Sequence, residues 1–265
     1  MVDVLKGKRG LIMGIANNHS IAWGIAKVLQ SEGAQLAFSY QGEAIGKRLK
    51  PLASELNSDF TIPCNVEDSA SIDSLFAQIQ DRWGSLNFIV HSIGFSDKNE
   101  LKGPYVNTSR DNFIRTMLIS CFSFTEVAKR AAKLMPHGGA MITLTYGGST
   151  RVVPNYNVMG IAKAALEASV KYLACDYGNM NIRVNAISSG PIRTLAGASI
   201  AHGRDIASWS RDNSPLQRTV SLEDIGNSAL YLLSNMSNGV TGEIHYVDCG
   251  YNITAMPLHN KKTID

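Results

Sequence analysis

The stretch "GLIMGIANNHSIAWGIA", residues 10–26, combines three features that predict the start of an α/β fold. A short apolar run ends at a glycine, a polar loop follows, and Ser20 precedes a segment with the apolar spacing of a capped helix. This order brings the unpaired N–H groups and positive dipole end of a helix toward a pyrophosphate. Gly14 would let the backbone pass close to the ligand, and Gly24 would let the helix pack tightly on the sheet. A tight turn in any α/β protein is an equally good interpretation, because the stretch departs from G-x-G-x-x-G.

The same alternation of apolar runs and helical segments continues along the chain. Continuous apolar runs are typical of parallel strands that are covered on both faces. We therefore predict one α/β domain over residues 1–265, a Rossmann-like, doubly wound sheet of seven parallel strands with helices on both faces and a crevice at the strands' carboxyl ends. The predicted strands are residues 10–14, 35–40, 59–64, 86–92, 140–146, 181–188 and 243–248, and the predicted helices are residues 20–31, 43–57, 69–82, 110–134, 156–177 and 222–233.

One long stretch, residues 188–221, interrupts this alternation and is predicted to be irregular. A connection of this length is uncommon in a compact domain unless it works as a lid or a binding loop. We therefore interpret it as a functional segment.

Composition excludes several classes of function. The net charge of +3 comes from 25 basic and 22 acidic residues without a basic run, so no nucleic-acid partner is predicted. No segment approaches the ~20 apolar residues of a membrane span, and the first apolar run is too short for a signal peptide. The six histidines are scattered, so no metal site is expected. The four widely spaced cysteines predict reduced thiols in a cytoplasmic protein: Cys64, Cys121, Cys175 and Cys249.

The ends of the second and third predicted strands indicate the cofactor. The second strand ends in Tyr40 and Gln41, with no arginine or lysine before Lys47. An amide can bind ribose hydroxyls or adenine but offers no charge to a 2′-phosphate, so NADH is favoured over NADPH. Asn65 and Val66 follow the third strand and suit the edge and face of adenine, although a polar turn with a buried valine is an equal alternative.

The fifth predicted strand and the following helix carry the candidate catalytic residues. Tyr146 ends the strand, and Tyr156 and Lys163 stand seven residues apart on the predicted helix. Seven residues turn through about 700°, so the two side chains would share one face roughly 10 Å apart along the axis. Either residue alone would more often be a surface or packing residue, but three such side chains at one strand end favour a site.

The spacing of tyrosine and lysine bears on the reaction. Reduction of a ketone needs a proton donor next to the carbon that accepts the hydride. Reduction of an α,β-unsaturated thioester puts hydride on the β-carbon and negative charge on an oxygen two carbons away, so the stabilising hydroxyl must lie further out. A tyrosine one turn earlier than a four-residue spacing would place it there. Whether that tyrosine donates a proton or only stabilises the enolate is left open.

These residues carry a resemblance to a known family. The motifs "GIANNHSIAWGIA" (14–26), "VHSIGF" (90–95), "PNYNVMGIAKAALEA" (154–168), "RVNAISSGPIRTLA" (183–196) and "GEIHYVDCGYNI" (242–253) resemble those of enoyl-acyl carrier protein reductases, a divergent branch of the short-chain dehydrogenase/reductase superfamily. Relative to Lys163, the superfamily's usual tyrosine position falls at Met159 and its usual serine position at Tyr146. The resemblance spans nearly the whole chain.

The resemblance implies an NADH-dependent reductase of trans-2-enoyl thioesters carried on acyl carrier protein, in a homotetramer. Residues 188–221 would form its substrate-binding lid. Two features depart from the family's pattern: Asn65 replaces a common aspartate, and the lid carries only His202 and Arg204 at a place where relatives have more basic residues. The implied catalytic residues are Tyr146, Tyr156 and Lys163, the implied substrate contacts are Ser96, Tyr146 and Tyr156, and the implied cofactor contacts are Gly14, Ile15, Ser20, Ile21, Gln41, Asn65, Val66, Ile93, Lys163, Ile192, Arg193, Thr194, Leu195 and Ala196.

Two other functions are compatible with parts of the sequence. A ketoacyl reductase or another dehydrogenase of the superfamily would need a tyrosine at position 159, where this chain has Met159. A dinucleotide-sensing module without catalysis would be expected to keep the phosphate turn and lose Tyr156 or Lys163, and both are present.

Overall fold

The protein is described from a computed structural model that covers residues 3–192 and 203–256, without the side chains of residues 203–205. Its centre is one seven-stranded sheet in the order β3-β2-β1-β4-β5-β6-β7, and every pair of neighbouring strands is parallel. The predicted Rossmann-like sheet is therefore confirmed. The strands are β1 (Arg9–Met13), β2 (Gln35–Tyr40), β3 (Thr61–Pro63), β4 (Phe88–His91), β5 (Gly139–Thr145), β6 (Ile182–Ser189) and β7 (Ile244–Val247).

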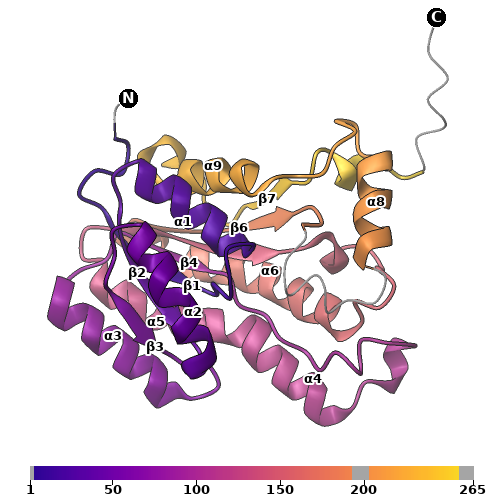
Figure 1. Ribbon diagram of the computed structural model, residues 1–265, viewed down its shortest axis with the longest axis horizontal. Helices are drawn as coiled ribbons and strands as arrows, with labels where there is room; N and C mark the ends of the chain where they lie inside the picture. Colours follow the sequence, from indigo (N-terminus) through magenta and orange to yellow (C-terminus); the bar gives the residue numbers. More distant parts are fainter. Residues whose placement is uncertain (1–2, 193–202, 257–265) are drawn as a thin grey trace, which may run out of the picture.

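Helices cover both faces of this sheet (Figure 1). Short 3₁₀ turns lie at residues 105–107, 132–134, 147–149, 178–180, 235–237 and 251–253. No described helix is long and apolar enough to span a lipid bilayer. The α-helices are α1 (Ile21–Ser31), α2 (Gly42–Glu55), α3 (Ser69–Trp83), α4 (Arg110–Met117), α5 (Ser123–Ala131), α6 (Val158–Tyr177), α8 (Gly203–Asn213) and α9 (Leu222–Leu233).

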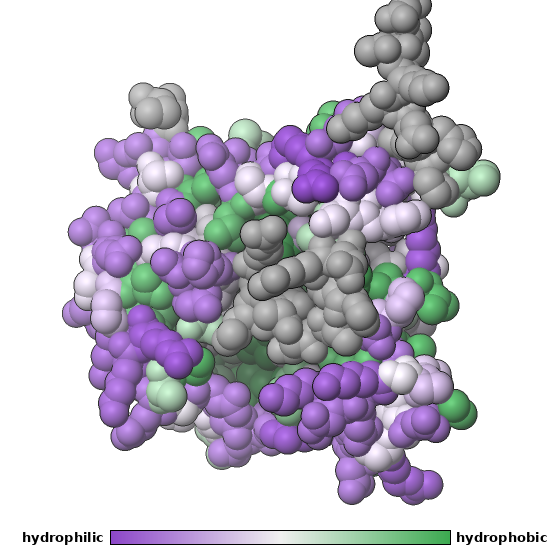
Figure 2. All heavy atoms as spheres, turned by 45° about the vertical axis from the view of Figure 1, so that its right-hand side comes forward, coloured by the Kyte–Doolittle hydropathy of each residue, from purple (hydrophilic) through white to green (hydrophobic). Residues whose placement is uncertain are grey.

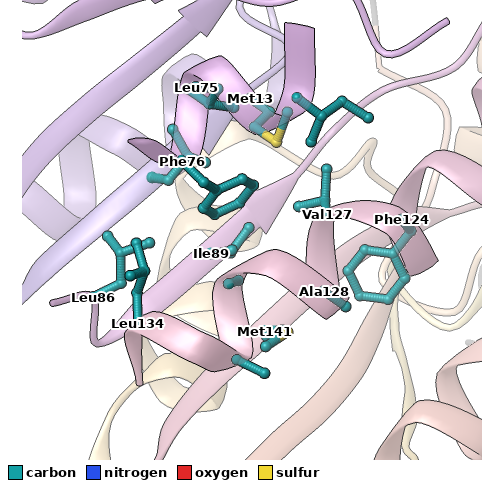
Figure 3. Packing of buried hydrophobic residues seen from close by; sticks show 14 of the residues in the cluster. Met13, Leu75, Phe76, Leu86, Ile89, Phe124, Val127, Ala128, Leu134 and Met141 are labelled. Carbon is teal, nitrogen blue, oxygen red and sulfur yellow. The ribbon is translucent and has the colours of Figure 1, made fainter. Parts of the chain in front are cut away.

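Alternate residues along each strand pack into two separate hydrophobic cores, one on each face of the sheet. In β1, Leu11 and Met13 pack into the layer formed with α3, α5 and α6, whereas Ile12 packs into the layer formed with α1, α2 and α9. Figure 3 shows the first layer, where Met13 and Ile89 from the sheet meet Phe76 and other helix side chains. Because both faces of the strands are buried, successive residues are apolar, and the strands appear in the sequence as unbroken apolar runs.

Two helix predictions and the prediction of one irregular stretch need correction. The helix expected over residues 110–134 is divided, because a π-helix (Leu118–Phe122) separates α4 from α5. The helix expected over 156–177 begins at Val158 instead, because Asn157 has a left-handed φ of 43°. The stretch 188–221 is not irregular throughout, since β6 extends to Ser189 and α8 lies within it.

Helix α1 packs against α9 more closely than against any other helix. A methyl group on Gly24 would lie 2.6 Å from Cβ of Leu222, and one on Gly226 would lie 3.1 Å from the Gly24 carbonyl oxygen. Gly24 therefore permits close helix–helix packing, and the expectation that it faces the sheet is wrong. Ser221 and Asp224 form a capping box at the start of α9 and so fix where this contact begins.

The order of the strands places the crevice beside β1. The chain proceeds from β1 to β2 on one side and later returns to β4 on the other, and ligands of such sheets bind at this reversal. The β7 arrow in Figure 1 shows that the carboxyl ends of the strands face right. Figure 2 brings that side forward and shows apolar surface in a hollow framed by polar side chains.

Candidate active site

The phosphate end of the crevice is built on a close approach of two backbones. Gly14 follows β1 with a φ of 96°, and a methyl group there would overlap the Ser92 carbonyl after β4. Only glycine can adopt this positive φ without strain and also leave room for the Ser92 carbonyl. Ile15 is buried behind it at 2% exposure. The close neighbour of Gly14 is thus another strand end, and its predicted closeness to a ligand stays a prediction.

The Ser20 side chain binds the loop that precedes α1 instead of its own helix. Its hydroxyl oxygen accepts the N–H groups of Ala16 and Asn17 at 3.0 and 3.2 Å, and it makes no side-chain cap to α1. The predicted side-chain cap is therefore wrong. The consequence favours an anion, because the first N–H groups of α1 are left without a side-chain cap and point toward the crevice.

At the adenosine end, Gln41 and Asn65 meet across β2 and β3. The Gln41 amide donates to Asn65 Oδ1 at 3.1 Å, and the same oxygen accepts the Glu67 N–H at 3.1 Å. The tip is thus a pair of neutral amides, which offer no positive charge to a 2′-phosphate. Val66 is only 7% exposed and belongs to a hydrophobic core, so its side chain fits the alternative of a buried valine.

Two tyrosines form the chemical end of the crevice. Tyr146 follows the last residue of β5, and the centroid of its ring is 5.1 Å from that of Tyr156, with the planes at 75°. Burial raises the pKa of Tyr146 to about 12, with Tyr251 adding to the shift. Burial also raises the pKa of Tyr156 well above its ordinary value. Both hydroxyls are therefore protonated at neutral pH and can act as hydrogen-bond donors.

Tyr156 does not lie on α6. It is held in a turn between Asn155, with a φ of 62°, and Asn157, with φ 43° and ψ −125°. The expected helical geometry between Tyr156 and Lys163 is therefore wrong. A non-glycine residue in such a conformation costs on the order of 1–3 kcal/mol and persists only where the surroundings impose it.

Glycine at position 148 makes room for the Tyr156 ring. A methyl group on Gly148 would overlap Cδ1 of Tyr156 and lie 2.8 Å from Cε1. Gly160 in α6 repeats the pattern, since a methyl group there would lie 2.7 Å from the Gly148 carbonyl oxygen. The tight turn after β5 therefore sets the position of the ring.

Lys163 lies on α6 with only 7% of its surface exposed. Its ammonium group donates to the Leu144 carbonyl at 2.8 Å, which ties α6 to the end of β5. Burial lowers the pKa of Lys163 to about 8, while nearby Cys121 and Glu167 oppose the shift. The lysine is thus mainly cationic at neutral pH and loses its charge at mildly alkaline pH.

The loop after β4, which contains Ile93, is held by hydrogen bonds from side chains that were not predicted from the sequence. Ser120 lies in the π-helix, accepts the Phe95 N–H at 2.9 Å and donates to the Phe95 carbonyl at 3.0 Å. Asn112 donates to Ser96 Oγ at 3.1 Å, and Thr116 donates to the same oxygen at 3.0 Å. Ser96 is therefore engaged with α4, and its contact with an acyl substrate stays a prediction.

A buried histidine supports the same region. His91 is fully buried at the end of β4, where its Nε2 lies 2.9 Å from Ser123 Oγ and its Nδ1 3.1 Å from Thr143 Oγ1. Both hydroxyls also donate to carbonyl oxygens, Ser123 to that of Ile119 in the π-helix and Thr143 to that of His91 itself. Burial, with the nearby charge of Lys163, lowers the pKa of His91 to about 3, so it stays neutral. Nothing in the sequence distinguished this histidine from the other five.

Several predicted contacts fall outside the described residues. These are the cofactor contacts Arg193, Thr194, Leu195 and Ala196, together with the side chains of His202 and Arg204 in the predicted lid. Ile192, which is described, is partly buried and packs on the core of the α1 layer. Within residues 3–192 and 203–256, no three histidine, cysteine or acidic side chains gather as metal ligands.

Known enoyl-acyl carrier protein reductases match nearly the whole chain. The family model described as "Enoyl-(Acyl carrier protein) reductase" matches residues 14–252. The chain is 71% identical over 257 residues to "Enoyl-[acyl-carrier-protein] reductase [NADH] 2" of Rhizobium meliloti (strain 1021), which is 97% of this chain and 96% of that relative.

Solved structures give the same relationship. The crystal structure of FabI from Candidatus Liberibacter asiaticus is 79% identical, with a TM-score of 0.95 over 97% of this chain and 100% of that one. A reductase from Anaplasma phagocytophilum, solved in complex with NAD, is 53% identical, with a TM-score of 0.93 over 96% of this chain and 97% of that one.

Proposed function

This chain belongs to the enoyl-(acyl carrier protein) reductase family, and from that membership we propose which of its residues carry out the reaction. The protein is an NADH-dependent oxidoreductase that reduces the double bond of enoyl thioesters in fatty-acid elongation. The observation that carries the residue assignment is the setting of Tyr156. Its ring is buried against Tyr146, and its hydroxyl has no hydrogen-bond partner among the described residues.

The crevice suits NADH in three respects. The turn at Gly14 has no room for a side chain, the start of α1 lacks a side-chain cap, and Gln41 and Asn65 can hydrogen-bond ribose hydroxyls but bring no positive charge for a 2′-phosphate. Bound NADH supplies the hydride for the β-carbon of the substrate. We assign its binding to the described residues Gly14, Ile15, Ser20, Ile21, Gln41, Asn65, Val66, Ile93, Lys163 and Ile192, and to the undescribed Arg193, Thr194, Leu195 and Ala196.

The chain's own residues manage the charge that this reduction creates. As the β-carbon accepts hydride, the electron pair of the double bond moves toward the thioester carbonyl and leaves an enolate oxygen. Tyr156 donates its hydroxyl to that oxygen, and Lys163 holds the ribose hydroxyls and adds positive charge. Protonation of the α-carbon completes the reduction. Met159 has no proton to give at the position where a ketone reductase has its tyrosine.

A comparison of two substrates tests this assignment. We expect the enzyme to oxidise NADH with a crotonyl or longer trans-2-enoyl thioester and to show no comparable rate with the matched 3-ketoacyl thioester. Loss of NADH absorbance measures both rates. Turnover of the ketoacyl thioester alone would show that the site performs ketone reduction.

The substrate reaches this enzyme on acyl carrier protein. We assign the lid to residues 188–221, with Ser96 and Tyr146 as further acyl contacts. Helix α8 supports this assignment, because it lies within the segment and packs against the turn at residues 251–253.

We also propose a homotetramer. Helices α4 and α6 lie against each other and expose large apolar side chains, among them Ile114 at 58% and Tyr172 at 76%. Phe122, in the π-helix between α4 and α5, is 52% exposed. Apolar groups gathered on neighbouring helices are typical of an interface. Sedimentation velocity is expected to give four times the mass of the chain, and a monomeric mass would contradict the proposal.

The free thiols of the chain support a cytoplasmic location. All four cysteines are unpaired, and Cys64, Cys121 and Cys249 are buried. Free thiols persist in reducing compartments. Recovery of the protein from a periplasmic or membrane fraction would contradict this location.

A further inference from the structure

Tyr156 belongs to a tight turn whose shape depends on the next residue. The Met159 N–H donates to the Tyr156 carbonyl at 3.0 Å, which closes a four-residue turn. Asn157 occupies its first central position with φ 43° and ψ −125°, the angles of a type II′ turn. Glycine is the usual residue in this conformation, and asparagine is among the few side chains that tolerate it.

The side chain of Asn157 ties this turn to a distant loop. Its Nδ2 donates to the carbonyl oxygens of Glu100 and Gly103, at 3.4 and 3.1 Å. The loop is itself anchored, because the Glu100 carboxylate accepts both the N–H and the hydroxyl of Ser109 at 2.8 Å, at the start of α4. One amide group therefore joins the backbone around Tyr156 to the loop that leads from β4 to α4.

We propose that Asn157 is a positioning residue for Tyr156: its amide holds the type II′ turn in register with the loop at residues 100–103 and so fixes where the tyrosine hydroxyl points. This inference rests on the proposed role of Tyr156. The ring of Tyr156 is already confined by Tyr146 and by the space at Gly148. The two hydrogen bonds of Asn157 to Glu100 and Gly103, which we call the Asn157 tether, confine the backbone that carries the ring. The contacts with Tyr146 and Gly148 act on the ring itself.

The matched control is Asn155, on the other side of Tyr156. Asn155 also has a left-handed φ, of 62°, but its side chain has no hydrogen-bond partner among the described residues. Replacing either asparagine with glycine keeps the left-handed backbone accessible. Asn157→Gly removes both hydrogen bonds to the loop at residues 100–103, whereas Asn155→Gly removes no side-chain hydrogen bond to the described residues. Asn157→Asp is a second variant, which keeps the size of the side chain and loses both N–H donors.

Steady-state kinetics with an enoyl thioester and direct measurement of NADH affinity test the proposal. We expect Asn157→Gly and Asn157→Asp to lower kcat by about ten- to hundredfold, the scale of a small misplacement of a catalytic group. NADH affinity should stay within about twofold, because the tether does not touch the cofactor residues. Asn155→Gly should retain kcat within about twofold. Thermal unfolding of each variant verifies that it is folded.

A double-mutant cycle separates positioning from general destabilisation. If Asn157 acts through the tyrosine hydroxyl, adding Asn157→Gly to Tyr156→Phe should cause almost no further loss of kcat, because the two effects are not additive. Full additivity would overturn the proposal, and so would wild-type kcat in both Asn157 variants. If Tyr156→Phe itself retains wild-type kcat, the proposed role of Tyr156 fails instead.

Discussion

Replacing Tyr156 with phenylalanine is expected to lower kcat for a 2-enoyl thioester by roughly 10²–10³-fold, the usual loss when one donor to a developing oxyanion is removed. Phenylalanine keeps the ring packed on Tyr146 and removes only the hydroxyl. NADH affinity should change by less than about twofold, because this hydroxyl acts on the substrate oxygen. Stopped-flow oxidation of NADH and fluorescence titration measure the two quantities separately.

The control for this variant is Tyr231→Phe, on α9, where the side chain is 36% exposed and belongs to the other layer. It should retain full activity. Because burial raises the pKa of Tyr156, the hydroxyl of the native enzyme stays protonated through neutral pH, so the loss in Tyr156→Phe should not vary with pH there. A Tyr156→Phe enzyme with the kcat of the native protein would remove Tyr156 from the mechanism.

Replacing Lys163 with alanine is expected to weaken NADH binding by about ten- to hundredfold. A hydrogen bond from a charged group contributes roughly 1.5–3 kcal/mol, and about 1.4 kcal/mol corresponds to a factor of ten. Lys171→Ala is the matched control, because Lys171 lies on the same helix and is exposed. Unchanged NADH affinity in Lys163→Ala would refute the assignment of this residue to the cofactor.

The pH dependence of NADH affinity provides a second readout for Lys163. Burial lowers the pKa of Lys163 to about 8, below its ordinary value. Below that pH the ammonium is present and binding is strong; above it, the neutral amine predominates and affinity should fall by up to about tenfold per pH unit. The Lys163→Ala variant should show no such decline. A native enzyme with constant affinity across this range would mean that the charge of Lys163 does not contribute.

Much of the architecture could be predicted because burial on both faces leaves a clear mark in the sequence. Runs such as those around Ile89 and Met141 fill two cores at once, and their strands were placed within one or two residues. The third strand, predicted over residues 59–64, pairs over Thr61–Pro63 at the edge of the sheet, where it has one partner.

The wrong predictions have local causes that the hydrophobic periodicity of the sequence does not indicate. Asn157 and its left-handed φ delay the start of α6, although the residues from Tyr156 onward have helical character. Ser20 stands where a cap is expected, but the N–H groups of Ala16 and Asn17 compete for its hydroxyl. The two asparagines around Tyr156 were the available signal for a turn, since this residue type is enriched at left-handed positions.

The π-helix between α4 and α5 makes the site sensitive to the length of the chain. A continuous α-helix would cover the same turn with one residue fewer, so if all the present residues of Leu118–Phe122 were α-helical, α4 would be rotated by about 100° and shifted by ~1.5 Å relative to α5. Asn112 and Thr116 would turn away from Ser96, and the loop after β4 would lose its support. Deletions and insertions in this segment are therefore less tolerable than most substitutions, and the number of residues is itself a functional property of the sequence.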